Sequence, residues 1–99
     1  MPLPIELPME EIKALCAKYQ VKELALFGSV LRPDFREDSD VDVLVDFDPD
    51  TAIGLLGFSR LARELGSLLS RNVDLVPKEG LKRRIRRPVL ESAQIIYER

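Results

Sequence analysis

The hydrophobic positions in the first half of the chain predict one helix followed by two strands. The segment 8–19 has apolar residues at the i, i+3, i+4 and i+7 spacing of one helical face, namely Ile12, Leu15, Cys16 and Tyr19. The apolar run Val21–Phe27 ends at Gly28, which is typical of a short buried strand. Asp40–Phe47 alternates between apolar and mainly acidic residues, which predicts a second strand with one buried face.

The second half of the chain predicts a long helix, a strand and a basic helix. The long helix is indicated by an apolar stripe made of Phe58, Leu61, Ala62, Leu65, Leu68 and Leu69. A third strand is expected at Val73–Val76, stopped by Pro77. A basic helical segment follows Gly80 and is expected to stop or restart at Pro88, and 95–97 is either a last strand or the end of that helix. This order predicts an α/β fold in one domain, residues 1–99: a small mixed sheet with helices packed on one face and the other face open.

The composition of the chain excludes several kinds of catalytic and metal site. The 99 residues include no histidine, which excludes histidine acid–base chemistry, Ser–His triads and His-ligated zinc. The single cysteine, Cys16, cannot form an internal disulfide, and no apolar stretch approaches the ~20 residues of a membrane span. We therefore expect a cytoplasmic protein with no membrane segment. The net charge is only −2, but eight acidic residues lie within 34–50 and six basic residues within 78–87.

Asp40 and Asp42 are candidate metal ligands. They stand at i and i+2 of a predicted strand, so their side chains point the same way from Cα atoms ~7 Å apart. Two like charges this close are unfavourable unless a cation lies between them, and Mg²⁺ is commonly held by one or two carboxylates plus substrate phosphates. Asp74 reaches the same face if its strand is a neighbour, and three carboxylates could then hold two ions for in-line nucleotidyl displacement. Alternating aspartate and valine is also the ordinary pattern of a strand with one wet face.

The Gly28–Ser29 turn is a candidate phosphate site. It directly follows a buried strand, and Gly28 allows a close backbone approach that side chains forbid. Exposed backbone N–H groups at such a turn, with a serine hydroxyl beside them, suit a phosphate. A triphosphate held here could share its oxygens with ions at Asp40 and Asp42.

Taken together, Gly28-Ser29-Val30-Leu31-Arg32 and Asp38-Ser39-Asp40-Val41-Asp42 resemble the signature of the DNA polymerase beta nucleotidyltransferase superfamily. The chain looks closest to the minimal nucleotidyltransferases, short prokaryotic proteins often encoded beside a HEPN-domain partner. The resemblance covers most of the chain and implies the nucleotidyltransferase fold.

The resemblance also assigns roles to individual residues. It implies that Gly28 and Ser29 bind the triphosphate, that Asp40 and Asp42 coordinate two Mg²⁺ ions, and that Asp74 completes one metal site and helps deprotonate the attacking hydroxyl. Arg32 matches a commonly basic position, where it either touches phosphate or forms an ion pair with Asp34. Pro33 stands where many relatives have glycine, which predicts an altered loop path.

In function, the resemblance implies Mg²⁺-dependent transfer of AMP from ATP to a protein, with the chain as the antitoxin that AMPylates a HEPN toxin partner. Larger relatives add domains that hold the acceptor, and 99 residues leave no room for one, so we expect a protein acceptor. Two alternatives stay open: a non-catalytic antitoxin that masks its HEPN partner sterically, and a nucleotidyltransferase acting on a small molecule.

The basic segment Lys82–Arg87 has three interpretations: a solvated helix face, a docking surface for an acidic partner, or an aid to phosphate binding. Nucleic-acid binding is disfavoured, because aromatic residues are not interleaved with the basic ones and the overall charge is negative.

Overall fold

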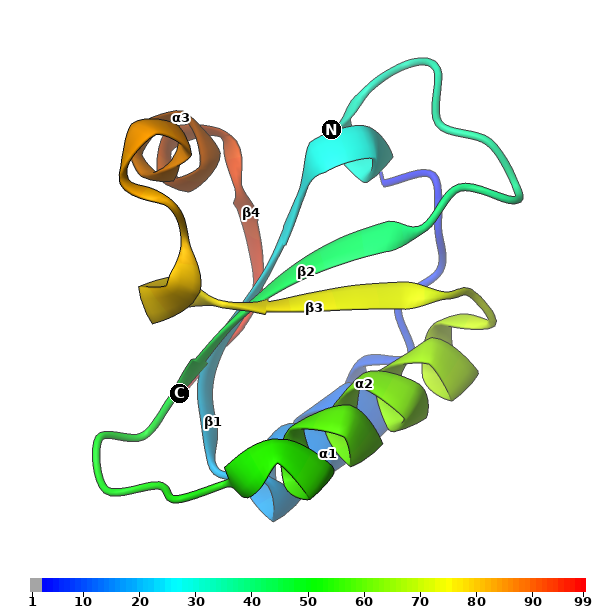
Figure 1. Ribbon diagram of the computed structural model, residues 1–99. Coiled ribbons are helices and arrows are strands. Elements are labelled where there is room, and N and C mark those ends of the chain that lie inside the picture. The colour runs from blue at the N-terminus through cyan, green and yellow to red at the C-terminus, as the bar shows by residue number, and fades with distance from the viewer. Residues whose placement is uncertain (1–2) are drawn as a thin grey trace.

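The computed structural model describes residues 3–99 and shows a four-stranded sheet with three α-helices (Figure 1). In chain order the elements are α1 (Met9–Lys18), β1 (Val21–Phe27), the 3-10 turn η1 (Gly28–Leu31), β2 (Val41–Phe47), α2 (Gly54–Leu69), β3 (Val73–Pro77), the 3-10 turn η2 (Lys78–Gly80), α3 (Arg83–Ser92) and β4 (Gln94–Glu98). The strand order is β3-β2-β1-β4; β2 and β3 are parallel and the other pairs antiparallel. The predicted small mixed α/β sheet is confirmed.

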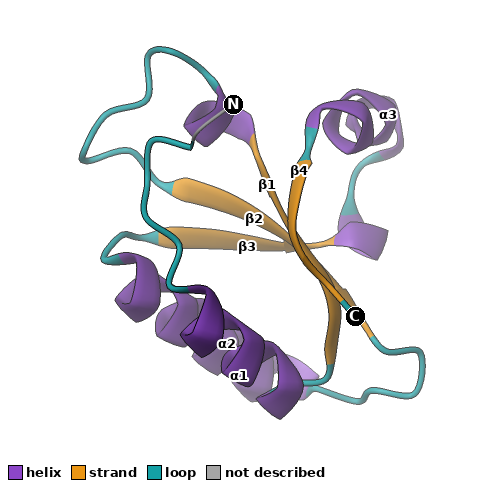
Figure 2. Cartoon of the chain, turned by 180° about the vertical axis from the view of Figure 1, so that it is seen from behind, coloured by secondary structure: helices purple, strands orange, loops and turns teal. Residues whose placement is uncertain are grey.

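The main core lies between one face of the sheet and the helices α1 and α2, which run side by side (Figures 1 and 2). The alternation read from the sequence decides which side chains enter it, because every second residue of a strand points to the same face. Val41, Val43 and Val45 of β2 are buried here against Leu61 and Leu65 of α2. Among the described residues, no helix combines the length and apolar character needed to cross a membrane.

Cys16 belongs to this core, as its place on the apolar stripe of α1 predicts. Its side chain is fully buried, and burial raises the pKa of the thiol to about 12. Because the thiolate is the reactive form, Cys16 is an inert core residue at neutral pH.

The second face of the sheet is partly covered, which corrects the expectation that all helices lie on one face. Ala25 and Leu44 are register partners on this face and are only 1% and 2% exposed. They pack with Leu81, with Val89 in the second half of α3 and with Ala93, which directly follows that helix. Figure 1 shows α3 on the opposite side of the sheet from α1 and α2. An apolar pair in the middle of the face requires this cover, so the face stays accessible mainly at its acidic end.

The end of the chain resolves two open points of the sequence interpretation. The segment 95–97 lies in β4, paired antiparallel to β1, and is not the end of a helix. The expected interruption at Pro88 is wrong, since α3 runs through it. Pro88 provides no N–H for the Arg84 carbonyl, but Arg84 is exposed, so water can take the place of that donor.

The core accounts for the stability of the sheet and can be tested at Leu65, which is 1% exposed. We expect Leu65→Ala to lower the free energy of unfolding by about 3 kcal/mol, through lost burial and the cavity left behind. The measurement is urea unfolding followed by circular dichroism. Leu56→Ala is the matched control, because Leu56 lies on the same helix but is 78% exposed, and it should change stability by less than about 0.5 kcal/mol. Equal losses in the two variants would contradict this description of the core.

Candidate functional site

Gly28 brings the backbone against the carboxylate of Asp42. β1 ends at Phe27, the register partner of Asp42, and the chain then turns with a φ of 74° at Gly28. This left-handed conformation suits glycine alone at little cost. A Cβ added at Gly28 would lie 2.2 Å from Oδ2 of Asp42. Both the backbone conformation and the close approach therefore require glycine at this position.

The charge state of Asp42 reflects its surroundings. Burial and the nearby Asp74 carboxylate raise the pKa of Asp42 above its ordinary value, and the Asp40 carboxylate adds to this. The backbone N–H of Ser29, which donates a hydrogen bond to Asp42, and the Arg32 charge act in the opposite direction. Repulsion and desolvation thus outweigh the available donors, so a cation at Asp42 would be favourable.

Sheet pairing brings the predicted carboxylates to one end of the second face. β3 lies next to β2 in parallel, and Asp74 is the register partner of Asp42. Their Cα atoms are therefore about 4.8 Å apart, the usual distance between neighbouring strands. Asp40 immediately precedes β2 and is exposed, as Asp74 is. The juxtaposition expected for Asp74 is present, and its chemical role stays a prediction.

The donor set suits magnesium in combination with a phosphate ligand. Within residues 3–99, no group of three or more His, Cys, Asp or Glu residues is arranged to hold a metal ion. Magnesium in proteins usually takes one or two carboxylates and fills its remaining positions with water and substrate phosphate oxygens. Asp40 and Asp42 offer such a pair, made of oxygen donors only and next to the turn predicted to hold phosphate. These two residues are the ones that would hold the ion.

Ser29 and Arg32 lie beside the carboxylates. The Ser29 hydroxyl Oγ donates a hydrogen bond to the Asp40 carbonyl oxygen, at 3.3 Å. Arg32 Nε lies 3.6 Å from Asp34 Oδ1, which is the ion pair considered as one alternative for Arg32. Both side chains are well exposed, and such a pair contributes at most about 1 kcal/mol. Arg32 could therefore leave Asp34 and bind a phosphate instead. The ion pair and the phosphate contact thus both remain possible roles for Arg32.

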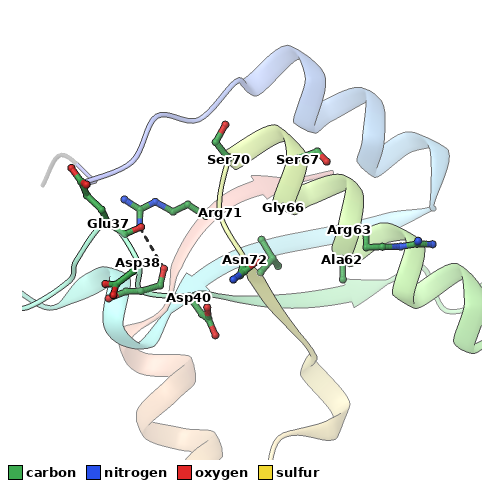
Figure 3. A pocket seen from close by; sticks show the side chains of 12 residues that line it. Glu37, Asp38, Asp40, Ala62, Arg63, Gly66, Ser67, Ser70, Arg71 and Asn72 are labelled. Carbon is green, nitrogen blue, oxygen red and sulfur yellow. Dashed lines mark hydrogen bonds between the residues drawn. The ribbon is translucent and has the colours of Figure 1, made fainter.

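An open hollow of about 970 Å³ adjoins the site between the loop 37–40 and the C-terminal half of α2 (Figure 3). Asp40 lines it, whereas Asp42 and Asp74 do not. The hollow therefore meets the carboxylate site only at Asp40. Nothing in the sequence pattern indicated it, because its walls come from segments about thirty residues apart that tertiary packing brings together.

Sequence reasoning missed Arg71, which follows α2 and reaches into the loop before β2. Its Nη1 donates hydrogen bonds to the carbonyl oxygens of Arg36 and Glu37, at 2.8 and 2.9 Å. A basic residue beyond the end of a helix is ordinarily read as solvated or as interacting with the helix dipole. Only the fold shows that this side chain has specific acceptors.

The basic segment Lys82–Arg87 is exposed along its length, and Arg87 forms an ion pair with Glu91 one turn later, Nε to Oε1 at 2.9 Å. Such an i, i+4 pair on an exposed helix is weak. The three interpretations of this segment stay open.

Comparison with known proteins agrees with this geometry. Residues 9–96 match the family described as Nucleotidyltransferase domain. The chain is 42% identical over 85 residues to Protein adenylyltransferase MntA of Thermococcus cleftensis, covering 86% of this chain and 82% of that protein. A solved structure named "putative minimal nucleotidyltransferase" is 42% identical, with a TM-score of 0.70 over 85% of this chain and 84% of that one.

A second solved structure is similar in fold alone. It is a complex of a tri-AMPylated Shewanella oneidensis HEPN toxin with an MNT antitoxin. The similarity has a TM-score of 0.64 at 21% identity, over 91% of this chain and 69% of that one.

The close approach at Gly28 gives a test with a matched control. Gly28 and Gly54 both have positive φ, but a Cβ at Gly54 would meet nothing within 4 Å. Alanine at either position should cost about 1–2 kcal/mol of stability from the left-handed backbone. Only Gly28→Ala must also displace the Asp42 carboxylate, so it should weaken binding of Mn²⁺ with a non-hydrolysable ATP analogue by about tenfold or more. Isothermal titration calorimetry measures this, and equal affinities for the two variants would refute the proposed importance of the approach.

Proposed function

Because the chain belongs to the nucleotidyltransferase domain family, we propose that it transfers AMP from ATP to a protein acceptor and that this acceptor is a HEPN-domain toxin. The chain is a nucleotidyltransferase, and its relative from Thermococcus cleftensis is named as a protein adenylyltransferase. The observation that carries the proposal is the pairing of Asp42 with Asp74 next to the Gly28–Ser29 turn. The proposed setting is the cytoplasm, where ATP is available.

The proposed roles follow from where the residues lie. The backbone at Gly28 and Ser29 binds the triphosphate, with Arg32 as a further phosphate contact. Asp40 and Asp42 would hold magnesium, as two ions once the nucleotide is bound. The bound magnesium would neutralise the negative charge of the phosphates. Asp74 accepts the proton of the acceptor hydroxyl. The acceptor oxygen then forms a bond to the α-phosphorus while the bond to pyrophosphate breaks, and pyrophosphate leaves.

In this mechanism the chain provides positioning and charge, without a covalent enzyme intermediate. The accessible acidic end of the second face leaves space for an acceptor, because Val89 of α3 and Ala93 after it cover only the middle of that face. A HEPN toxin is favoured as the acceptor by the Shewanella oneidensis complex, in which an AMPylated HEPN toxin is bound to an MNT antitoxin.

The test is to incubate the purified HEPN partner with this protein, ATP and magnesium, and to measure the intact mass of the partner. We expect a mass increase of one or more adenylyl groups, and we expect chelation of magnesium to prevent it. Absence of an increment would contradict protein adenylylation. A nucleotide transferred only to a small hydroxyl compound would favour the small-molecule alternative.

Variants that replace the charged carboxylates by neutral amides test whether the acidic site performs the transfer. Asp40→Asn combined with Asp42→Asn should abolish the mass increase, by a factor of at least about 10³, since the metal would lose its protein ligands. Asp46→Asn is the matched control, because Asp46 lies on the same strand four register pairs beyond Asp42 and has Glu23 as its register partner. It should keep nearly full activity.

The same variants test the masking alternative. A partner that is still neutralised by the Asp40→Asn, Asp42→Asn protein is held sterically rather than modified. An adenylyl increment that survives in this double variant would overturn the assignment of these two aspartates.

A further inference from the structure

Arg71 contacts the loop 35–39, which directly precedes Asp40. Its Nη1 donates to the carbonyl oxygens of Arg36, Glu37 and Ser39, at 2.8, 2.9 and 3.4 Å. Its guanidinium carbon lies 4.5 Å from the centre of the Phe35 ring, within the range of a cation–π contact. Figure 3 shows the side chain pointing from the end of α2 toward the segment that carries Glu37 and Asp38. One side chain thus contacts four of the five residues 35–39.

Two of the loop's hydrogen bonds bear directly on Asp40. The Ser39 carbonyl, which belongs to the peptide unit before Asp40, accepts from Arg71. The Asp40 carbonyl, which belongs to the peptide unit after it, accepts from Ser29 Oγ at 3.3 Å. The two planar peptide units on either side of a Cα atom determine the direction of its Cα–Cβ bond, from which the side-chain rotamers start. Arg71 and Ser29 together therefore hold the backbone on both sides of Asp40 and fix the point from which its carboxylate extends.

The backbone of Arg71 is itself fixed. Its N–H donates to the Gly66 carbonyl at 3.0 Å, and a Cβ at Gly66 would lie 2.8 Å from the Arg71 carbonyl oxygen. The next residue, Asn72, accepts a hydrogen bond from the Val41 N–H at 2.9 Å, which joins the start of β3 to the start of β2. The Arg71 side chain thus connects the hydrogen-bonded turn after α2 to an exposed loop. This loop has few hydrogen bonds of its own, one of which joins the Ser39 N–H to the Arg36 carbonyl.

We propose that Arg71 is a positioning residue for metal and nucleotide binding, acting through the loop 35–40 on Asp40. This inference rests on the proposed function in one respect, namely that Asp40 is a metal ligand. Groups that orient a metal ligand typically contribute 10–100-fold to metal affinity or activity. Arg71 fits that class, since the loop has no other charged side chain from α2 or β3 bonded to its carbonyls among residues 3–99.

The test compares four variants of the chain: Arg71→Met, Arg71→Lys, Phe35→Leu and Arg63→Met. Arg71→Met removes the donors at similar length. Arg71→Lys keeps three N–H donors but loses the planar group over Phe35, and Phe35→Leu removes that contact while leaving Arg71 in place. Arg63→Met is the matched control, an exposed arginine of α2 with no hydrogen bond or ion pair to another described residue.

Two quantities are measured: the affinity for Mn²⁺ with a non-hydrolysable ATP analogue, by calorimetry, and backbone hydrogen exchange over 33–41, by mass spectrometry. We expect Arg71→Met to lose about tenfold in affinity and to exchange faster in this segment. Arg71→Lys and Phe35→Leu should show smaller changes in the same direction, and Arg63→Met none. Circular dichroism confirms that each variant is folded; if Arg71→Met is not, the lysine and leucine variants carry the test.

The outcomes separate this proposal from the proposed function. Wild-type affinity in folded Arg71 variants would overturn the positioning role, even if exchange rises, because the residue would then be a loop brace without effect on the site. The proposed function would still stand if Asp40→Asn abolishes binding in the same experiment. Absence of binding by the wild-type chain would overturn both.

Discussion

The contact between the Gly28 backbone and the Asp42 carboxylate, too close for any side chain between them, is the constraint on which the site depends. It places the Ser29 N–H group against Asp42 and turns the chain so that the Ser29 hydroxyl reaches the Asp40 backbone. One glycine with φ of 74° thus links the end of β1 to Asp42 of β2 and to Asp40, which immediately precedes that strand. The candidate phosphate turn and the candidate metal ligands are consequently one structural unit rather than two neighbouring features.

One face of the sheet provides most of the buried core, and the other face carries the candidate site. The face covered by α1 and α2 holds the main core, in which Val41, Val43 and Val45 are buried. The opposite face carries the side chains between them, of which Leu44 is covered from the side of α3 and Asp42 is half-buried. Grouping Asp40, Asp42 and Asp74 opposes folding by like-charge repulsion. The apolar core provides the stabilisation that allows these three aspartates to lie near one another despite their repulsion.

Local patterns predicted the parts of the structure that depend on nearby residues. The period of two in Asp40–Phe47 specified both β2 and its faces, and the apolar run before Gly28 specified β1 to the residue. The pairing of Asp74 with Asp42 was conditional, because it requires β3 to neighbour β2, and no local pattern states the order of strands.

The sequence did not predict the features that are formed by segments distant from one another in the chain. The position of α3 depends on Ala25 and Leu44, two apolar residues in otherwise polar positions whose need for cover becomes evident only once the sheet is paired. The Arg71 hydrogen bonds join residues 32 to 35 positions apart, where no periodicity applies.

The most direct measurement of the central claim is a crystal structure of the chain with Mn²⁺ and a non-hydrolysable ATP analogue, using the anomalous signal of manganese to locate the metal. We expect manganese bound by Asp40 and Asp42 together with phosphate oxygens, and the triphosphate bound by the backbone of Gly28 and Ser29. Manganese and triphosphate bound elsewhere, for example along the arginines of α3 with the aspartates free, would contradict it.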